Sequence, residues 1–239
     1  MPDTKSDSVP TAPSPFAPFR NRHRGERCVI MGNGPSLNRT DLDLLRAVPT
    51  FGMNKIFLLL PRLGWAPTYH VAVNPLVIEQ CREDILASSM PKFIGHEGRR
   101  MLPEREDILF LTSNRREPGF TTDLDQPLWQ GHTVTYCAMQ VAYHMGFSEV
   151  LLVGVDHSYQ CSGQPNEKVT ARGPDPNHFH PDYFSGGQSW QLPDLERSEA
   201  AYRLARQAFE ADGRRILDAT VGGRLTVFDK VRLEDALGR

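Results

Sequence analysis

Residues 27–37 read RCVIMGNGPSL, and this stretch decides the fold. Its first part, Arg27–Met31, is a mostly apolar run without alternation, which predicts a strand buried on both faces. The two glycines that follow allow a tight turn and a close approach of other atoms to the main chain. Proline and serine then suit a first helical turn, since proline has no N–H to lose there and serine is a cap. The stretch therefore predicts a strand, a turn and a helix.

The junction between this strand and helix also predicts an anion site. Free N–H groups and the helix dipole favour a phosphate there, and the alternative is a tight connection without a ligand. A dinucleotide fingerprint needs a third glycine where Leu37 stands, and a P-loop needs Gly-Lys-Ser/Thr, so neither NAD nor a Walker-type ATP site is expected. The residues predicted to hold the ligand are Gly32, Asn33, Gly34, Pro35 and Ser36.

Outward from this junction, short apolar runs alternate with longer amphipathic ones. Strands are predicted at 27–31, 50–54, 69–73, 92–94, 108–111, 149–153 and 215–217, and helices at 40–46, 76–87, 133–145 and 194–212. Apolar strands that alternate with helices indicate a mostly parallel sheet covered on both faces. The sequence predicts an α/β, Rossmann-like fold in one domain, residues 25–239.

Composition narrows the classes of protein. The 239 residues are 39% hydrophobic and 23% charged, which is enough apolar material for a core. A formal net charge of −2 argues against a dedicated nucleic-acid binder. The longest apolar run, Ile56–Leu60, is too short to cross a bilayer, and no signal peptide is recognised. The four cysteines are scattered, which suits a reducing compartment, and we expect a cytoplasmic protein.

The first 24 residues are rich in proline, serine and threonine. Such a segment does not bury enough apolar surface to offset its ordering entropy, so 1–24 is predicted to be a disordered tail. Its basic cluster at 20–24 is expected to be solvated, and a peripheral contact with an acidic membrane surface is the alternative.

Three asparagines stand at equivalent places in the predicted sheet. Asn33, Asn54 and Asn74 each follow one of the first three strands. Ligands of open α/β sheets bind at the carboxyl ends of the strands. An uncharged amide suits a sugar hydroxyl, a base edge or a phosphate oxygen, so we expect the three to share a ligand. A role as ordinary turn residues is the alternative.

Residues 158–193, here called the lid segment, form a long stretch rich in Gly, Pro, Asn and Asp. A stretch of this length without periodicity is functional or disordered. We expect it to close over the ligand and bring a histidine, His180 in preference to His178, to an acceptor hydroxyl as general base. His157, next to Asp156, is a further pocket candidate or else a turn residue.

Two other interpretations of the lid segment remain open. The two histidines with Asp175, Asp182 and His157 have spacing that is feasible for zinc, although we expect no metal. Alternatively, the segment packs on itself as a surface loop. The residues that would hold such a loop are Tyr183, Phe184 and Trp190.

An ordered series of motifs resembles known families. It comprises GNGPSL (32–37), HTVT (132–135), MGFSEVLLVGVD (145–156), NHFHPDYF (177–184) and ATVGG (219–223). The series resembles the bacterial sialyltransferases of glycosyltransferase family 42. It is also similar to the broader group called domain of unknown function 115, or 6-hydroxymethylpterin diphosphokinase MptE-like. The similarity spans about residues 27–228.

The sialyltransferase resemblance implies a GT-A-like sheet and a metal-independent, inverting transfer of a sugar from a CMP-activated donor to a glycan hydroxyl. It implies that the three asparagines contact the nucleotide and phosphate, and that a histidine after Asp156 is the base. Two departures are the pair Val134-Thr135, where the family has Ser-Gly, and a tyrosine displaced by one residue. The residues implied at this site are Thr133, Thr135, Asp156 and Tyr159, beside the asparagines and the lid histidines.

Two other functions stay open. One is an MptE-like, Mg- and ATP-dependent pyrophosphokinase acting on a pterin-type alcohol. The diphosphokinases resemble this chain but carry acidic residues where Asn74 stands, and an amide is a poor ligand for a hard cation. The other is a non-catalytic glycan-pathway module of the same fold. The expected partners are a nucleotide-sugar and a glycan acceptor, with homo-oligomerisation left open.

Overall fold

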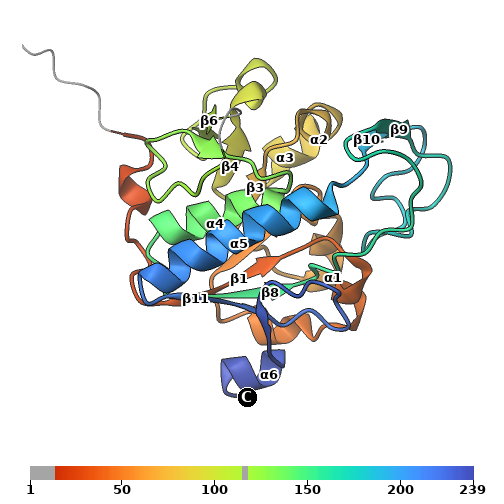
Figure 1. The fold of residues 1–239 in the computed structure, drawn as a ribbon. Helices are drawn as coiled ribbons and strands as arrows, with labels where there is room; N and C mark the ends of the chain where they lie inside the picture. Colours follow the sequence, from red (N-terminus) through yellow and green to blue (C-terminus); the bar gives the residue numbers. More distant parts are fainter. Residues whose placement is uncertain (1–13, 115–117) are drawn as a thin grey trace, which may run out of the picture.

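The sheet at the centre of the protein has eight strands, and every pairing within it is parallel (Figure 1). The structure is a computed structural model that describes residues 14–114 and 118–239. In sheet order the strands are β12 (Asp229–Lys230), β11 (Arg215–Asp218), β8 (Glu149–Val153), β1 (Arg27–Met31), β2 (Thr50–Met53), β3 (Tyr69–Ala72), β4 (Lys92–Gly95) and β5 (Ile108–Leu111). The predicted Rossmann-like α/β fold is confirmed.

The order of the strands reverses between β1 and β8. From β1 the chain adds β2, β3, β4 and β5 on one side, and then crosses to place β8 on the other side of β1. Val29 pairs with Thr50 of β2, and Cys28 pairs with Val150 of β8. In an open parallel sheet, such a switch point opens a crevice at the carboxyl ends of the two strands.

Two long helices cover one face of the sheet, where Figure 1 shows them side by side. They are α4 (Val134–His144) and α5 (Leu195–Ala211), and both pack on the largest core cluster. The opposite face carries η2 (Pro35–Arg39), η3 (Leu42–Leu45), η4 (Ile56–Leu59), α1 (Leu60–Leu63), α2 (Pro75–Gln80), α3 (Arg82–Ala87), η5 (His96–Arg100) and α6 (Leu233–Leu237). Within the described ranges, no helix has the length and apolarity needed to span a membrane.

Residues 14–24 differ from the predicted tail. They include the short helix η1 (Ala17–Phe19), and Phe16 is 5% exposed within the core cluster beneath α4. Phe19 contacts Phe93 edge-on with ring centroids 5.2 Å apart, and the Asn21 N–H donates to the His144 carbonyl. The prediction of disorder is therefore wrong for 14–24, because two phenylalanines anchor a proline-rich stretch. Residues 1–13 lie outside the described residues.

The lid segment contains a short antiparallel pair, β9 (Lys168–Thr170) and β10 (Ser189–Gln191). A second small pair, β6 (Ser113–Asn114) with β7 (Leu128–Trp129), follows β5. Figure 1 shows the two pairs on either side of α2 and α3, above the carboxyl ends of the central strands. Together they flank the crevice at the switch point.

Candidate functional site

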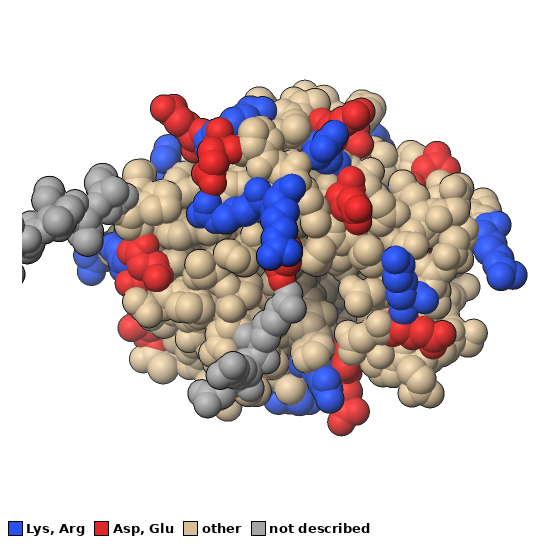
Figure 2. Space-filling view, turned by 90° about the horizontal axis from the view of Figure 1, so that it is seen from above, with Lys and Arg blue, Asp and Glu red and all other residues tan. Residues whose placement is uncertain are grey.

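A cavity of about 680 Å³ lies at the carboxyl ends of β1, β2, β3 and β8. The starts of α4 and α5 and the lid segment complete its walls. On the face shown in Figure 2 the surface is hollowed near its centre, and charged side chains of both signs surround the hollow. The cavity is large enough for a small-molecule ligand and stands where open α/β sheets bind theirs.

The two glycines of the GNG turn hydrogen-bond the end of β8 and the loop that follows it, at the switch point. The Gly32 N–H donates to the Val153 carbonyl at 2.7 Å, and the Gly34 N–H donates to the Gly154 carbonyl at 2.9 Å. A Cβ at Gly32 would lie 2.2 Å from the Gly154 carbonyl oxygen. Glycine is required here so that the two loops can touch.

Asp156 occupies the place predicted for a bound anion. Its carboxylate accepts from the Ser36 N–H at 3.1 Å and from the Ser36 hydroxyl at 2.6 Å. A Cβ at Gly34 would lie 1.9 Å from this carboxylate. Neither Pro35 nor Ser36 lines the cavity, whereas Gly32, Gly34 and Asp156 do. The predicted phosphate site at the start of η2 is therefore wrong, because the protein supplies its own anion there.

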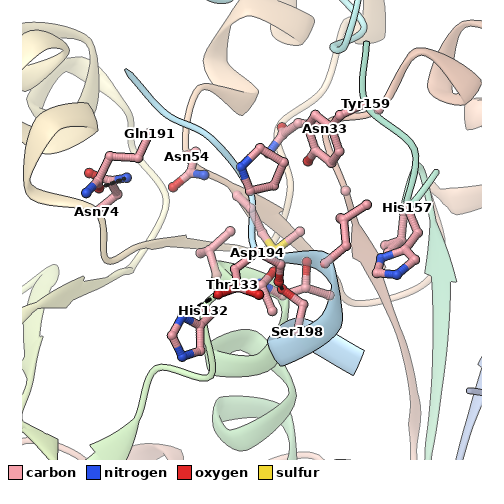
Figure 3. Close-up of a pocket in the computed structure, with 18 of the residues that line it drawn as sticks. Asn33, Asn54, Asn74, His132, Thr133, His157, Tyr159, Gln191, Asp194 and Ser198 are labelled. Carbon is pink, nitrogen blue, oxygen red and sulfur yellow. Dashed lines mark hydrogen bonds and ion pairs between the residues drawn. The ribbon is translucent and has the colours of Figure 1, made fainter. Parts of the chain in front are cut away.

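Two of the three predicted asparagines present unpaired oxygens to the cavity. The Oδ1 atoms of Asn33 and Asn54 are buried and have no hydrogen-bond partner in the structure. Figure 3 shows both side chains on one side of the cavity, opposite Thr133, Asp194 and Ser198. A buried acceptor without a donor costs free energy, so these two oxygens call for a partner such as an ordered water or a ligand.

Asn54 is held in an unusual conformation. Its φ of 49° lies in the left-handed region, and its carbonyl accepts a hydrogen bond from Nε2 of His70 at 2.7 Å. Burial lowers the pKa of His70 to about 4. A neutral His70 therefore donates from Nε2 and fixes the backbone that aims the Asn54 amide.

Asn74 lines the same cavity but is already partnered. Its Oδ1 accepts from the Leu76 N–H at 2.9 Å and so caps α2. Its Nδ2 donates to Oε1 of Gln191 in the lid segment at 3.5 Å, the contact drawn at the left of Figure 3. The structure thus brings all three asparagines to one cavity. The amide of Asn74 is already hydrogen-bonded through both its oxygen and its nitrogen.

The starts of α4 and α5 form the wall opposite the asparagines. Thr133 caps α4 by accepting from the Thr135 N–H, and both threonines line the cavity as predicted. Asp194 caps α5 by accepting from the Arg197 N–H. Both helices point their positive dipole ends at the cavity. Sequence analysis did not single out Asp194, although an acid just before an amphipathic helix is a recognisable cap.

The lid segment brings one of its two histidines to the cavity. His178 lines it, and its Nδ1 hydrogen-bonds Oδ2 of Asp175 at 2.7 Å. Its ring stacks on Tyr183 at 3.9 Å between centroids, and its Nε2 makes no hydrogen bond within the described residues. His180 lies outside the cavity lining, and its Nδ1 accepts from the Asp182 N–H. The structure therefore brings His178, and not the preferred His180, to the cavity.

Tyr159 is placed at the cavity as predicted. Its ring meets His178 edge-on at 6.1 Å, and it is 37% exposed. The aromatic residues of the lid segment also pack on one another, as the surface-loop alternative expects. Phe184 and Trp190 stack at 5.4 Å, and Tyr183 is 1% exposed.

Two further histidines at the cavity have acidic partners. Nε2 of His157 lies 3.0 Å from Oε1 of Glu199, and Nδ1 of His132 lies 4.0 Å from Oδ2 of Asp194. Both histidines have left-handed backbones, with φ of 52° and 61°. Backbone strain of this kind gathers at functional sites. His157 was a predicted pocket residue. Its partner Glu199 was not predicted, because it is 42 residues away and no local pattern links the two.

Lys55 holds the lid segment in place through contacts of its buried side chain, and the sequence did not predict this role. It is 2% exposed, and its Nζ donates to the Tyr183 carbonyl and, at 2.6 Å, to Oε1 of Gln188. The same Nζ lies 4.5 Å from the centroid of the Phe184 ring, a cation–π contact. Burial lowers the pKa of Lys55.

The described lining of the cavity contains histidines but neither lysine nor arginine. Its two carboxylates, Asp156 and Asp194, are both engaged as caps. Residues 14–114 and 118–239 contain no group of three His, Cys, Asp or Glu side chains placed to hold a metal ion. These residues do not fit the zinc alternative for the lid segment, because zinc takes three or four such side chains.

The sequence matches the family described as 6-hydroxymethylpterin diphosphokinase MptE-like over residues 5–162. A comparison with curated proteins found no match. The matched region runs through β1 to β8 and includes the three asparagines, α4 and Tyr159. Most of the lid segment and all of α5 lie beyond it, including His178 and Glu199.

Proposed function

The chain belongs to the 6-hydroxymethylpterin diphosphokinase MptE-like family, and from that premise we propose that it is a transferase acting on a nucleotide-activated substrate. The substrate we propose is a CMP-activated sugar, and the acceptor is a hydroxyl group of a glycan. The choice of cytidine follows the resemblance to sialyltransferases. The single observation that carries the proposal is the pair of unpaired, buried Oδ1 atoms of Asn33 and Asn54 at the switch point.

A nucleotide-sugar supplies what these two oxygens lack. Ribose and sugar hydroxyls and the cytosine amino group are hydrogen-bond donors, whereas a phosphate at neutral pH is mainly an acceptor. We therefore place the donor groups of the ligand on Asn33 and Asn54. The phosphate then faces the opposite wall at the start of α4, where the helix N-terminus favours an anion and the cap, Thr133, is uncharged.

The proposed base is His178. Asp175 accepts from its Nδ1, which leaves Nε2 to take a proton from the acceptor hydroxyl, the arrangement used by histidine–carboxylate pairs elsewhere. The acceptor oxygen bonds to the anomeric carbon, the bond from that carbon to the phosphate oxygen breaks, and CMP leaves with the electron pair. Closure of the cavity by the lid segment keeps water from the activated sugar.

The test is ligand binding by calorimetry with two matched variants. Asn54→Gly removes the amide from a left-handed position that glycine adopts easily, and Asn21→Gly does the same at φ 54° outside the cavity. We expect Asn54→Gly to weaken CMP binding about tenfold, the worth of one hydrogen bond of about 1.4 kcal/mol, and Asn21→Gly to leave it unchanged. Equal effects of the two variants, or no CMP binding by the unaltered protein, would refute the proposal.

A diphosphokinase is the second candidate, and the family description favours it. Such an enzyme would move the pyrophosphoryl group of ATP to a pterin hydroxymethyl group and release AMP. This chain has Asn74 where the diphosphokinases carry an acidic residue, and an amide is a poor ligand for Mg²⁺, which is why we rank this candidate second. Release of AMP from ATP that depends on both Mg²⁺ and a hydroxymethylpterin would reverse the ranking.

A further inference from the structure

Three histidines are the basic side chains in the described lining of the cavity. His132, His157 and His178 line it, and the described lining includes no lysine or arginine. A leaving phosphate gains negative charge as its bond to the sugar breaks, and a preorganised donor at that position lowers the barrier. Which of the three histidines could donate to the leaving phosphate depends on its hydrogen-bond partner and on its place in the cavity.

The side chain of His157 is more buried than that of His132 and lies closer to a carboxylate. Its side chain is 7% exposed and its Nε2 is 3.0 Å from Glu199, whereas the side chain of His132 is 25% exposed and its closest carboxylate is 4.0 Å away. The other ring nitrogen, Nδ1, makes no hydrogen bond within the described residues and is free to meet a ligand.

The position of His157 points to the phosphate rather than to the acceptor. It follows β8 by way of Asp156, at the strand that forms one side of the switch point. Its ring lies 6.3 Å from Tyr202, whose hydroxyl is 3.3 Å from the Oγ1 of Thr133 at the start of α4. Figure 3 shows His157 on the flank of the cavity between the asparagine side and the α4–α5 side.

We propose that His157 binds the phosphate of the nucleotide and stabilises it as the leaving group. This inference rests on the proposed function. As the acceptor oxygen bonds to the anomeric carbon and its proton passes to His178, the anomeric C–O bond breaks and both electrons stay on the phosphate oxygen. Nδ1–H of His157 donates a hydrogen bond to that oxygen, and Glu199 holds the ring in place.

The charged and titratable groups around His157 come from two elements. Glu199 and Tyr202 face it from α5, and Arg203 pairs with the same Glu199 carboxylate at 2.8 Å. Asp156 precedes it in its own loop and is engaged with Ser36. Substitution of Glu199 should therefore weaken the hydrogen bond that orients the His157 ring while leaving the histidine itself in the protein.

The experiment compares cytidine with CMP, because the two differ only in the phosphate. His157→Asn keeps a residue that tolerates a left-handed backbone, and His180→Asn is a control histidine outside the cavity lining. We expect His157→Asn to reduce the preference for CMP over cytidine about tenfold or more with cytidine affinity unchanged. Glu199→Gln should reduce the same preference in part, and His180→Asn should retain it.

The outcomes separate this inference from the proposed function. If the unaltered protein binds neither cytidine nor CMP, both fail together. If it prefers CMP and His157→Asn keeps that preference, the role of His157 is refuted while the proposed function stands. If His157→Asn weakens cytidine and CMP equally, the histidine shapes the cavity and does not contact the phosphate, which also refutes this inference.

Discussion

His70 and Asn54 show how a residue outside the cavity sets the geometry inside it. The histidine is buried, and its hydrogen bond holds the Asn54 carbonyl while the asparagine backbone is left-handed. Because burial depresses the pKa of His70 to about 4, the folded protein keeps this side chain neutral where an unfolded chain with a pKa of about 6.5 binds a proton.

This difference predicts a pH-dependent stability. Between pH 6.5 and 4 the unfolded state binds the proton of His70 and the folded state does not, so stability falls as the pH is lowered. We expect His70 to contribute a loss of about 2 kcal/mol in the free energy of unfolding between pH 7 and pH 5. Urea titrations at the two pH values should show a smaller loss in His70→Gln, and equal losses in both proteins would contradict the assignment.

The two lid histidines make a matched pair for catalysis. His178→Ala removes the proposed base, and we expect transfer to fall by about 10² to 10⁴ in kcat. Asp175→Asn should lower kcat by a smaller factor, because the ring keeps its place but loses its acidic partner. His180→Ala should keep the rate of the unaltered protein, since His180 lies outside the cavity lining. Turnover of CMP-sugar followed by CMP release measures all three, and a dominant effect of His180→Ala would contradict the assignment.

At the level of single residues, the sequence predicted the side chains that follow strands and missed those that depend on distant partners. Asn33 and Asn54 were found because a strand end fixes where the next residue points. The anion expected at Ser36 was wrong because Asp156, 120 residues away, caps the same N–H. No local pattern marks Lys55 as the residue beneath the lid segment, since its partners lie beyond residue 180.

Among the elements, the lid segment depends on a buried cation for its attachment. Lys55 contacts two neutral oxygens and the Phe184 ring, so its charge is satisfied without a carboxylate partner. Removing it deletes these contacts and also the cost of burying the charge. The net effect on global stability is therefore expected to be small, and the effect on the segment itself to be large.

The variant Lys55→Met tests this attachment. We expect proteolysis within residues 171–188 to become faster by about tenfold, which corresponds to about 1.4 kcal/mol of local opening, while the melting temperature of the domain changes little. Limited trypsin or chymotrypsin digestion followed by mass spectrometry measures it. An unchanged rate of cleavage in the segment would show that its aromatic packing holds it without the lysine.

The elements themselves were largely predictable. The seven predicted strands all form, because continuous apolar runs between turn residues leave few alternatives to a buried parallel strand. The predicted helix at 76–87 is divided at Cys81 into α2 and α3. The pairs β6–β7 and β9–β10 were not predicted, since strands of two or three residues carry too little periodicity to detect.

For the whole molecule, the absence of a metal cluster among the described residues yields a prediction about chelation. We expect EDTA to leave the binding of CMP unchanged. At a hundred times its dissociation constant, CMP should stabilise the fold by about 2.7 kcal/mol with or without the chelator. Thermal melts with CMP and with ATP, each with Mg²⁺ or EDTA, make the comparison. A stabilisation by ATP that vanishes with EDTA would favour the diphosphokinase.

The aromatic residues of the lid segment have a consequence for how a ligand reaches the cavity. Phe179, Tyr183 and Phe184 belong to the same buried cluster as Leu37 and as Ile56 and Leu59 of η4. Moving these side chains out would expose buried apolar surface to water. This part of the lid segment therefore stays packed over the cavity whether or not a ligand is bound. We therefore expect a nucleotide to enter the cavity without displacing these aromatic residues. Stopped-flow traces should accordingly show one exponential phase whose rate rises linearly with nucleotide concentration.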